Sequence, residues 1–332
     1  MRSFVLWYEK RENDSRREKP EIEIHVNLWK VQKNIKEEFI FDFGFLISDI
    51  TLVKDIYFYV PFKVEEHKDL GEKVLRNHQL AGAIFNEMCN ISTVRVGKRI
   101  NIKTGESETL RDFMFYSLGS DQIEVSDVND NHYGNLLILH LGNILSANEI
   151  SQNMEIENIK NYYFRFRMKT NKKNLKLVRN QDFDQSIFSN AFTRTEIIDF
   201  RINDIRTCSE QIKEKYGSNH KFNIKKINYL LLRNFNDEFI YHDGNVKSRI
   251  LENDLWDAYI EELHEDLIAY HIKKIAKNKN NDIDYIESFV SLARFKYQKS
   301  NFKIILKYLL ILLVSSIFTG IMSTILYEKF IK

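Results

Sequence analysis

The chain has 332 residues, of which 43% are hydrophobic and 29% are charged, and its formal net charge is +2. This length suffices for two ordinary domains or one large one, and this composition excludes a largely disordered protein. Because the net charge is close to zero, it gives no indication of nucleic acid or acidic partners, and any electrostatic argument has to be local.

The N-terminal segment contains a short apolar run, Phe4 to Tyr8, and charged residues follow at once. A secretory signal peptide needs a core of about 7–15 apolar residues. We therefore expect that the bulk of the chain is not exported.

Alternating and β-branched stretches dominate the chain from about residue 20 to about residue 243. Such stretches are typical of β-strands that are buried on one or both faces. They are EIEIHVNLW, FIFDFGFLI, KDIYFYVPFKV, NLLILHLGNIL, NYYFRFRMK, TEIIDFRIND and KKINYLLLRNF. Between them, DLGEKVLRNHQLAGAIFNEM carries an apolar stripe with helical spacing and predicts one helix at about residues 68–90. The predicted fold is α+β and mainly β.

The β-rich region is predicted to form two domains, 1–155, which includes the helix, and 156–247. EEFIFDFGFLISD followed by KDIYFYVPF resembles TEIIDFRINDIR followed by KKINYLLLRNF, with an Asp-Phe pair inside the first strand of each. Two related β domains in tandem would produce this similarity, and so would chance likeness between strand-rich segments. Both interpretations stay open.

The strand YYFRFRMK continues into TNKKNLKLVR, and no acid occurs between Tyr162 and Arg179. In an extended strand alternate side chains point to opposite faces, so the basic residues share one face and Phe and Met share the other. An exposed basic face would hold phosphate, a nucleotide or anionic lipid, or it would pair with acids on a neighbouring strand. The candidate surface for an anionic ligand comprises Arg165, Arg167, Lys169, Lys172, Lys173, Lys176 and Arg179.

Residues 248–302 are predicted to form a helical stalk. In ILENDLWDAYIEELHEDLIAYHIKKIAKNK, apolar residues recur with the period of an amphipathic helix, and acids gather early and lysines late, as suits the helix dipole. A polar break at KNKNND precedes DIDYIESFVSLARFKYQK, a second predicted helix that leads to the C-terminal segment.

The segment YLLILLVSSIFTGIMSTILY, Tyr308 to Tyr327, contains no charged residue. About 20 apolar residues in a helix cross the core of a bilayer, so residues 303–328 are predicted to be one transmembrane helix that anchors the chain by its tail. Positive residues stay on the cytoplasmic side, which predicts a single-pass protein of the cell inner membrane with a cytoplasmic N-terminal body. The membrane-proximal basic residues, which also suit anionic head groups, are Arg294, Lys296, Lys299, Lys303 and Lys307.

Small, partly polar residues recur on one face of the predicted span. In lipid, helices associate through small residues that allow close approach and through hydroxyl hydrogen bonds. The stripe predicts a self-associating span and hence a homo-oligomer, with a small pore as a further hypothesis; alternatively, such residues are ordinary constituents of a span. The stripe comprises Ser315, Ser316, Thr319, Gly320, Ser323 and Thr324.

Signatures of catalysis and of metal or cofactor binding are missing from the sequence. The phosphate-binding GxxxxGKS/T, the dinucleotide-binding GxGxxG and the GxSxG nucleophile elbow do not occur. Cys89 and Cys208 are far apart, no zinc-type spacing occurs, and DVNDNHYG has His132 where a calcium loop requires glycine. We therefore predict no enzyme, no metal and no cofactor, although a catalytic site assembled from distant residues stays open.

In outline, the chain has a soluble body, a stalk and one terminal span that contains Ser316, Gly320 and Thr324. In this architecture it resembles the single-span transmembrane effectors of bacterial antiviral defence modules. The resemblance implies a body that senses a cytoplasmic protein partner or another signal, with nucleic acid or a nucleotide involved indirectly, and a span that clusters and disturbs the membrane. The alternatives are a passive membrane-anchored binding module or adaptor and an anchored hydrolase.

Overall fold

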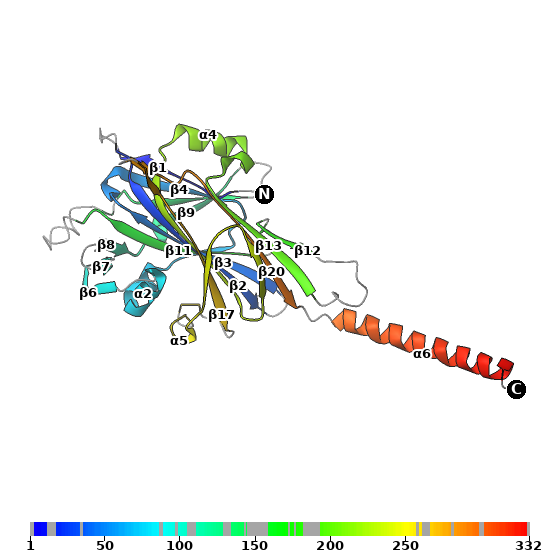
Figure 1. Ribbon diagram of the computed structural model, residues 1–332. Helices are drawn as coiled ribbons and strands as arrows, with labels where there is room; N and C mark the ends of the chain where they lie inside the picture. The colour runs from blue at the N-terminus through cyan, green and yellow to red at the C-terminus, as the bar shows by residue number, and fades with distance from the viewer. Residues whose placement is uncertain are drawn as a thin grey trace. The chain divides into compact units, whose positions relative to one another are not determined.

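The computed structural model confirms a mainly β fold with one apolar helix at the C-terminal end (Figure 1). Its described residues fall into two compact units. The body consists of residues 1–178, 198–235 and 242–293, and the tail unit consists of residues 179–197, 236–241 and 294–332. The structure describes residues 3–11, 18–33, 36–85, 89–96, 99–104, 111–128, 134–142, 144, 159–171, 173–175, 177–181, 193–256, 259–260, 266–279, 282–298 and 302–330.

A ten-stranded sheet organises the body. Most neighbouring strands are antiparallel, whereas β14 pairs with β2, and β11 with β8, in parallel. Because strands from both sides of residue 155 lie in this one sheet, the structure does not divide the chain at the predicted boundary. In order of pairing the strands are β16 (Val246–Ile250), β17 (Leu267–Ile275), β14 (Asn223–Asn234), β2 (Glu21–Lys33), β3 (Lys36–Ile47), β11 (Tyr162–Asn171), β8 (Arg111–Tyr116), β7 (Arg99–Thr104) and β6 (Cys89–Val96), with β5 (Glu66–Asp69) paired to β11.

Smaller elements complete the fold. A four-stranded sheet in the body has the order β1 (Val5–Lys10), β4 (Val53–Val60), β10 (Asn135–His140) and β9 (Ile123–Asp127). Another sheet has the order β12 (Val178–Gln181), β13 (Thr193–Ile202), β20 (Phe289–Gln298) and β15 (Glu238–His242), and β18 (Lys277–Lys279) pairs with β19 (Asp282–Asp284). The helices are α1 (Gly71–Arg76), α2 (His78–Phe85), α4 (Glu210–Ser218), α5 (Asn253–Trp256) and α6 (Phe302–Phe330), with 3-10 turns η1 (Ile50–Leu52), η2 (Ser120–Gln122) and η3 (Ile205–Thr207).

The alternation in FIFDFGFLI gives β3 a role in two cores of the body. On one face, the rings of Phe43 and Phe45 lie with their centroids 4.7 and 5.5 Å from that of Phe58 on β4. On the other face, Ile40 and Leu46 belong to a buried cluster that includes residues of α1 and α2. Burying one such side chain contributes about 1.5–3 kcal/mol, so both faces of this strand stabilise the fold.

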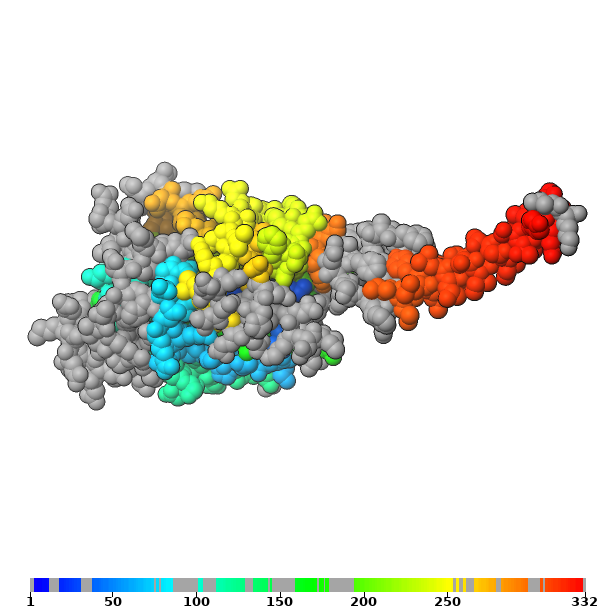
Figure 2. All heavy atoms as spheres, turned by 90° about the horizontal axis from the view of Figure 1, so that it is seen from below, coloured from blue at the N-terminus to red at the C-terminus, as the bar shows by residue number. Residues whose placement is uncertain are grey.

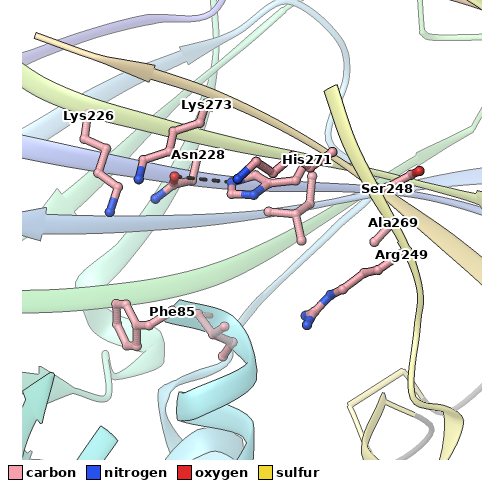
Figure 3. A pocket seen from close by; sticks show the side chains of 11 residues that line it. Phe85, Lys226, Asn228, Ser248, Arg249, Ala269, His271 and Lys273 are labelled. Atoms are coloured by element: carbon pink, nitrogen blue, oxygen red, sulfur yellow. Dashed lines mark hydrogen bonds between the residues drawn. The ribbon is translucent and has the colours of Figure 1, made fainter. Parts of the chain in front are cut away.

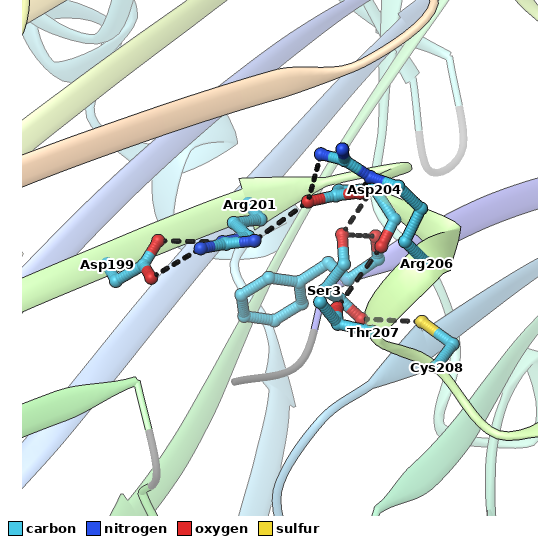
Figure 4. Close-up of polar contacts among 8 residues, drawn as sticks. Ser3, Asp199, Arg201, Asp204, Arg206, Thr207 and Cys208 are labelled. Carbon is cyan, nitrogen blue, oxygen red and sulfur yellow. Dashed lines mark hydrogen bonds and ion pairs between the residues drawn. The ribbon is translucent and has the colours of Figure 1, made fainter.

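The first described residues are tied to the turn that follows β13. Phe4 is fully buried; its N–H donates to the carbonyl of Arg201 at 2.9 Å, and its carbonyl accepts from the N–H of Asn203 at 2.7 Å. Asn203 has a φ of 57°, a left-handed conformation in which asparagine is enriched. In Figure 4, the N–H of Asp204 donates to Oγ of Ser3 at 3.0 Å, and Arg201 pairs with Asp204 at 2.8 Å. The N-terminal segment is therefore an integral part of the body.

The predicted helical stalk is wrong for the described residues of 248–302. β17 and β20 lie where the two helices were predicted, and α5 spans only Asn253–Trp256. β17 pairs antiparallel with β14 through nine residue pairs, from Ile275 opposite Lys226 to Leu267 opposite Asn234. The β-branched and aromatic residues of LIAYHIKKI suit a strand, and pairing with a distant strand overrides the local helical period.

α6 carries the predicted apolar segment. Its residues Tyr308–Phe330 form a 23-residue stretch that is long and apolar enough to cross a membrane, and its most apolar part is not buried at all (Figure 2). At 1.5 Å per residue such a stretch is about 34 Å long, compared with about 30 Å for the hydrocarbon core of a bilayer. Within the ranges that the structure describes, α6 is thus the single candidate membrane-spanning helix, and it suggests membrane anchoring.

Candidate anion-binding pocket

The structure corrects part of the predicted basic surface, because other segments, Tyr259 among them, cover the face of β11 that carries its arginines. Arg165 is fully buried and Arg167 is 7% exposed, so neither presents its charge to solvent. β3 pairs with the whole of β11 along one side, and β5 and β8 pair with it on the other. Lys169 is half-buried and lies 3.1 Å from Glu66, whereas Lys173 is exposed. Outside the described residues or side chains lie Lys172, Lys176 and the side chain of Arg179.

Asp42 on β3 holds the guanidinium group of Arg167 in a bidentate ion pair. Nε and Nη2 of Arg167 donate to the two carboxylate oxygens at 2.7 and 3.0 Å. Nε1 of Trp29 donates to the same carboxylate at 2.9 Å. The ring of Tyr259 lies 4.9 Å from the guanidinium carbon of Arg167, within the range of a cation–π contact. Arg167 is therefore a structural residue with its charge neutralised in place.

Arg165, in contrast, has neutral partners. Its Nε donates to the hydroxyl of Tyr259 at 2.6 Å, and its Nη1 donates to the hydroxyl of Tyr163 at 3.0 Å. Gly44 makes room for Tyr163, since a Cβ at position 44 would lie 1.9 Å from its hydroxyl oxygen. Asp42 thus pairs with Arg167, while tyrosine hydroxyls hold Arg165. We name this group, which consists of Asp42, Tyr163, Arg165, Arg167 and Tyr259, the buried arginine cluster.

A cavity of about 210 Å³ opens where β14, β16 and β17 lie beside α2 (Figure 3). Lys273 on β17 lies opposite Asn228 on β14, and Lys247 on β16 lies opposite His271 on β17. Residues at alternate positions of each strand share a face, so this register gathers their side chains at one place. The polar lining comprises Asn228, Ser248, His271 and the four pocket cations Lys226, Lys247, Arg249 and Lys273, and Ile84 and Phe85 of α2 add an apolar wall.

Positive charge dominates this cavity. No carboxylate lines it among the residues that the structure describes, although Lys226 lies 3.7 Å from Glu23, which is not part of the lining. Burial, followed by the charges of all four pocket cations, lowers the pKa of His271 from its usual value. Nε2 of His271 lies 3.4 Å from Oδ1 of Asn228. These surroundings favour a neutral imidazole ring in a strongly positive site.

The pocket and the buried arginine cluster share one face of the large sheet. Asn228 lies opposite His25, His25 opposite Gly44, and Gly44 opposite Arg165. At about 4.8 Å per strand, this row brings Arg165 within about 14 Å of Asn228. The ring of Phe85 lies between, with its centroid 5.2 Å from that of His25 and 4.8 Å from that of Tyr163. The buried arginine cluster and the pocket are therefore near neighbours on this face of the sheet.

The chemistry that this arrangement offers is the binding of an anion. Lysine ammonium groups supply point charges, and the arginine fork matches the oxygens of a carboxylate or a phosphate. Sequence reasoning missed the site because the segment was interpreted as a helical stalk. The signal was nevertheless present, since NVKSRI and AYHIKK place basic residues at alternate positions, which lie on one face of a strand.

The other predicted site residues lie in β20 and α6. Arg294 and Lys296 are exposed on β20, and Lys296 lies 3.7 Å from Glu238. Lys303 and Lys307 belong to α6, and Lys299 lies outside the described residues. In the predicted stripe, hydroxyl groups donate to carbonyls of their own helix, from Ser315 to Leu312, Thr319 to Ser316 and Thr324 to Gly320, at 2.9–3.0 Å. Self-association of the span stays a prediction.

No known family model matches the sequence, and no curated protein matches it. Among solved structures, the Fcho1 Mu homology domain of Danio rerio with bound Eps15 peptide is similar over 89% of this chain and 81% of that chain. The identity is 6% and the TM-score is 0.17. A likeness at this level carries no argument about the fold or the function of this chain, so both rest on the structure described above.

Proposed function

We propose that this protein is a membrane-anchored receptor whose body binds an anionic ligand in the pocket of β14, β16 and β17. The observation that carries the proposal is the group of four pocket cations around one cavity, without a carboxylate among the described lining residues. Lys247, Arg249 and Lys273 are exposed, so an anion in solution can reach them. Like charges gathered at one cavity create a local positive potential that attracts such an anion.

The anchor is α6, and the membrane is the place where the receptor acts. The basic residues that precede the span favour a cytoplasmic location of the body and a single pass through the inner membrane. We propose this orientation, and we also propose a cytoplasmic protein partner that binds the body in its ligand-bound state.

The response that we propose is self-association of the span, followed by disturbance of the membrane, as in the antiviral effectors that a soluble body with one terminal span resembles. The support for it is the row of small residues around Gly320, which allows two helices to approach closely. A passive anchor for an adaptor is the competing function.

Two variants of full-length protein separate these functions. Gly320→Leu adds a large side chain to the stripe, whereas Met322→Leu, on the opposite side of the helix, conserves volume. We expect both to stay in the membrane fraction after carbonate extraction. Chemical crosslinking in membranes should yield oligomers for the wild type and Met322→Leu and mainly monomer for Gly320→Leu. Equal crosslinking of the wild type and both variants would contradict self-association through the stripe and would favour an anchored receptor whose span does not cluster.

A further inference from the structure

We infer that the pocket takes a small phosphate-bearing anion with at least two negative charges, and that His271 holds this anion as an imidazolium. The inference rests on the proposed function of the pocket as an anion site, and it specifies the ligand class and the role of one residue.

The size of the cavity restricts the ligand. Pockets for drug-sized molecules have volumes of about 300–1,000 Å³, whereas this cavity has about 210 Å³. An inorganic diphosphate or a phosphate ester with a short carbon chain suits such a space better than a whole nucleotide does. Ile84 and Phe85 form the apolar wall against which a short carbon chain would lie.

The charges of the lining select the anion. Lys226 is shared with Glu23, and within the described part of the chain no carboxylate lines the cavity beside Lys247, Arg249 and Lys273. A single carboxylate would neutralise only one of them. A phosphate group carries close to two charges at neutral pH and offers three acceptor oxygens, so it can accept from several of these donors at once.

The protonation state of His271 also determines how well the pocket binds an anion. With Oδ1 of Asn228 as acceptor, Nε2 of His271 carries the proton of the neutral ring. The second nitrogen, Nδ1, then presents a lone pair, which an anion repels. Protonation turns Nδ1 into a donor, so the anion and the imidazolium stabilise each other.

The groups that face His271 determine the sign of the pH dependence. Lys273 on its own strand, Lys226 with Asn228 on β14, and Lys247 with Arg249 on β16 surround it, and α2 contributes the uncharged Ile84 and Phe85. Without an anion, the cations lower the pKa of the ring. An anion offsets this repulsion and raises that pKa, so binding takes up a proton, and the affinity falls as the pH rises from the pKa of the free ring to the pKa of the ring in the complex.

The test is isothermal titration calorimetry of the full-length protein in phosphatidylcholine nanodiscs, with inorganic pyrophosphate and with sulfate as probes. Titrations in two buffers of different ionisation enthalpy measure proton uptake. Sulfate does not titrate near neutral pH, so any proton taken up with sulfate binds to the protein. We expect saturable binding of both probes, tighter for pyrophosphate, with proton uptake that is abolished in His271→Gln.

Lys273 and Lys274 provide a matched pair on β17, because adjacent residues of a strand point to opposite faces and only Lys273 lines the cavity. Lys273→Gln should weaken binding about tenfold or more, as expected for one lost charge-assisted hydrogen bond. Lys274→Gln should bind like the wild type. This pair keeps the test informative even if His271→Gln folds poorly.

Two sources of the phosphate group are distinguished by the lipid of the nanodisc. Phosphatidic acid should compete with pyrophosphate if the natural ligand is a lipid head group, whereas phosphatidylserine, which lacks a terminal phosphate, should not. Absence of competition indicates a soluble phosphate compound, and either result supports the ligand class. Sulfate binding without proton uptake, or tighter binding of sulfate than of pyrophosphate, overturns this inference and leaves an anion receptor. No binding of either probe overturns the proposed function as well.

Discussion

Asp42→Asn tests the buried arginine cluster most severely. Asp42 is the carboxylate of this cluster, where it accepts two hydrogen bonds from Arg167 and one from Trp29. Without its charge, Arg165 and Arg167 remain buried with no anion among their hydrogen-bond partners. Breaking a buried ion pair from one side costs about 3–5 kcal/mol, and since asparagine keeps one acceptor oxygen, we expect about 3 kcal/mol. The free energy of unfolding of a domain is about 5–15 kcal/mol, so the loss expected for Asp42→Asn is a large share of the stability.

The assay is urea unfolding of the full-length protein in detergent micelles, followed by tryptophan fluorescence, to which Trp29 beside Asp42 contributes. The control is Asp112→Asn, since Asp112 lies 3.8 Å from Lys103 with 40% of its side chain exposed, and such a pair contributes about 0–1 kcal/mol. A double variant, Asp42→Leu with Arg167→Met, should recover part of the lost stability because it removes both members of the ion pair, whereas Arg165 stays buried without an anion. Equal unfolding midpoints for Asp42→Asn and Asp112→Asn would refute the reasoning.

Three further predictions concern other parts of the chain. Gly44→Ala should destabilise the body by about 1–3 kcal/mol, because its Cβ would lie 1.9 Å from the hydroxyl oxygen of Tyr163; a wild-type unfolding midpoint would contradict the tight contact. Burial raises the pKa of Asp69 to about 6, so the folded protein holds its proton more tightly than the unfolded chain, and this group destabilises the fold increasingly as the pH rises from about 4 to 6. Asp69→Asn should therefore gain stability relative to the wild type over this interval, and a constant difference between the two proteins would exclude the shift. For the span, Gly320→Leu should lose the crosslinked oligomer that Met322→Leu retains, as measured in native membranes.

The sequence predicted the parts of the fold that local patterns determine. The aromatic and β-branched run FIFDFGFLI identified β3. The apolar stripe near residue 80 identified a helical region, although the single predicted helix of about residues 68–90 is divided into α1 and α2. The 20-residue charge-free segment from Tyr308 to Tyr327 identified α6. In each case the signal and the structure occupy the same stretch of chain.

The rest depends on pairing between distant segments. The stretch around Leu267 has helical periodicity, but its partner is β14, about 40 residues earlier, and the hydrogen bonds of that pairing decide its structure. In the same way, Arg165 alternates with phenylalanine as an exposed basic face would, yet distant segments cover this face. The ring of Tyr259 lies over both guanidinium groups, and helices α1 and α2 pack in the same cluster as Tyr163. The pocket cations come from three strands, so no single window of sequence contains the site.

The central claim is that four cations on β14, β16 and β17 form an anion site in a membrane-anchored protein. The most direct measurement is the dissociation constant for inorganic pyrophosphate of full-length protein in phosphatidylcholine nanodiscs, compared between Lys273→Gln and Lys274→Gln. The structure predicts binding at least about tenfold weaker for Lys273→Gln, while Lys274→Gln matches the wild type. Equal affinities for the two variants, or no binding by the wild type, would contradict the account.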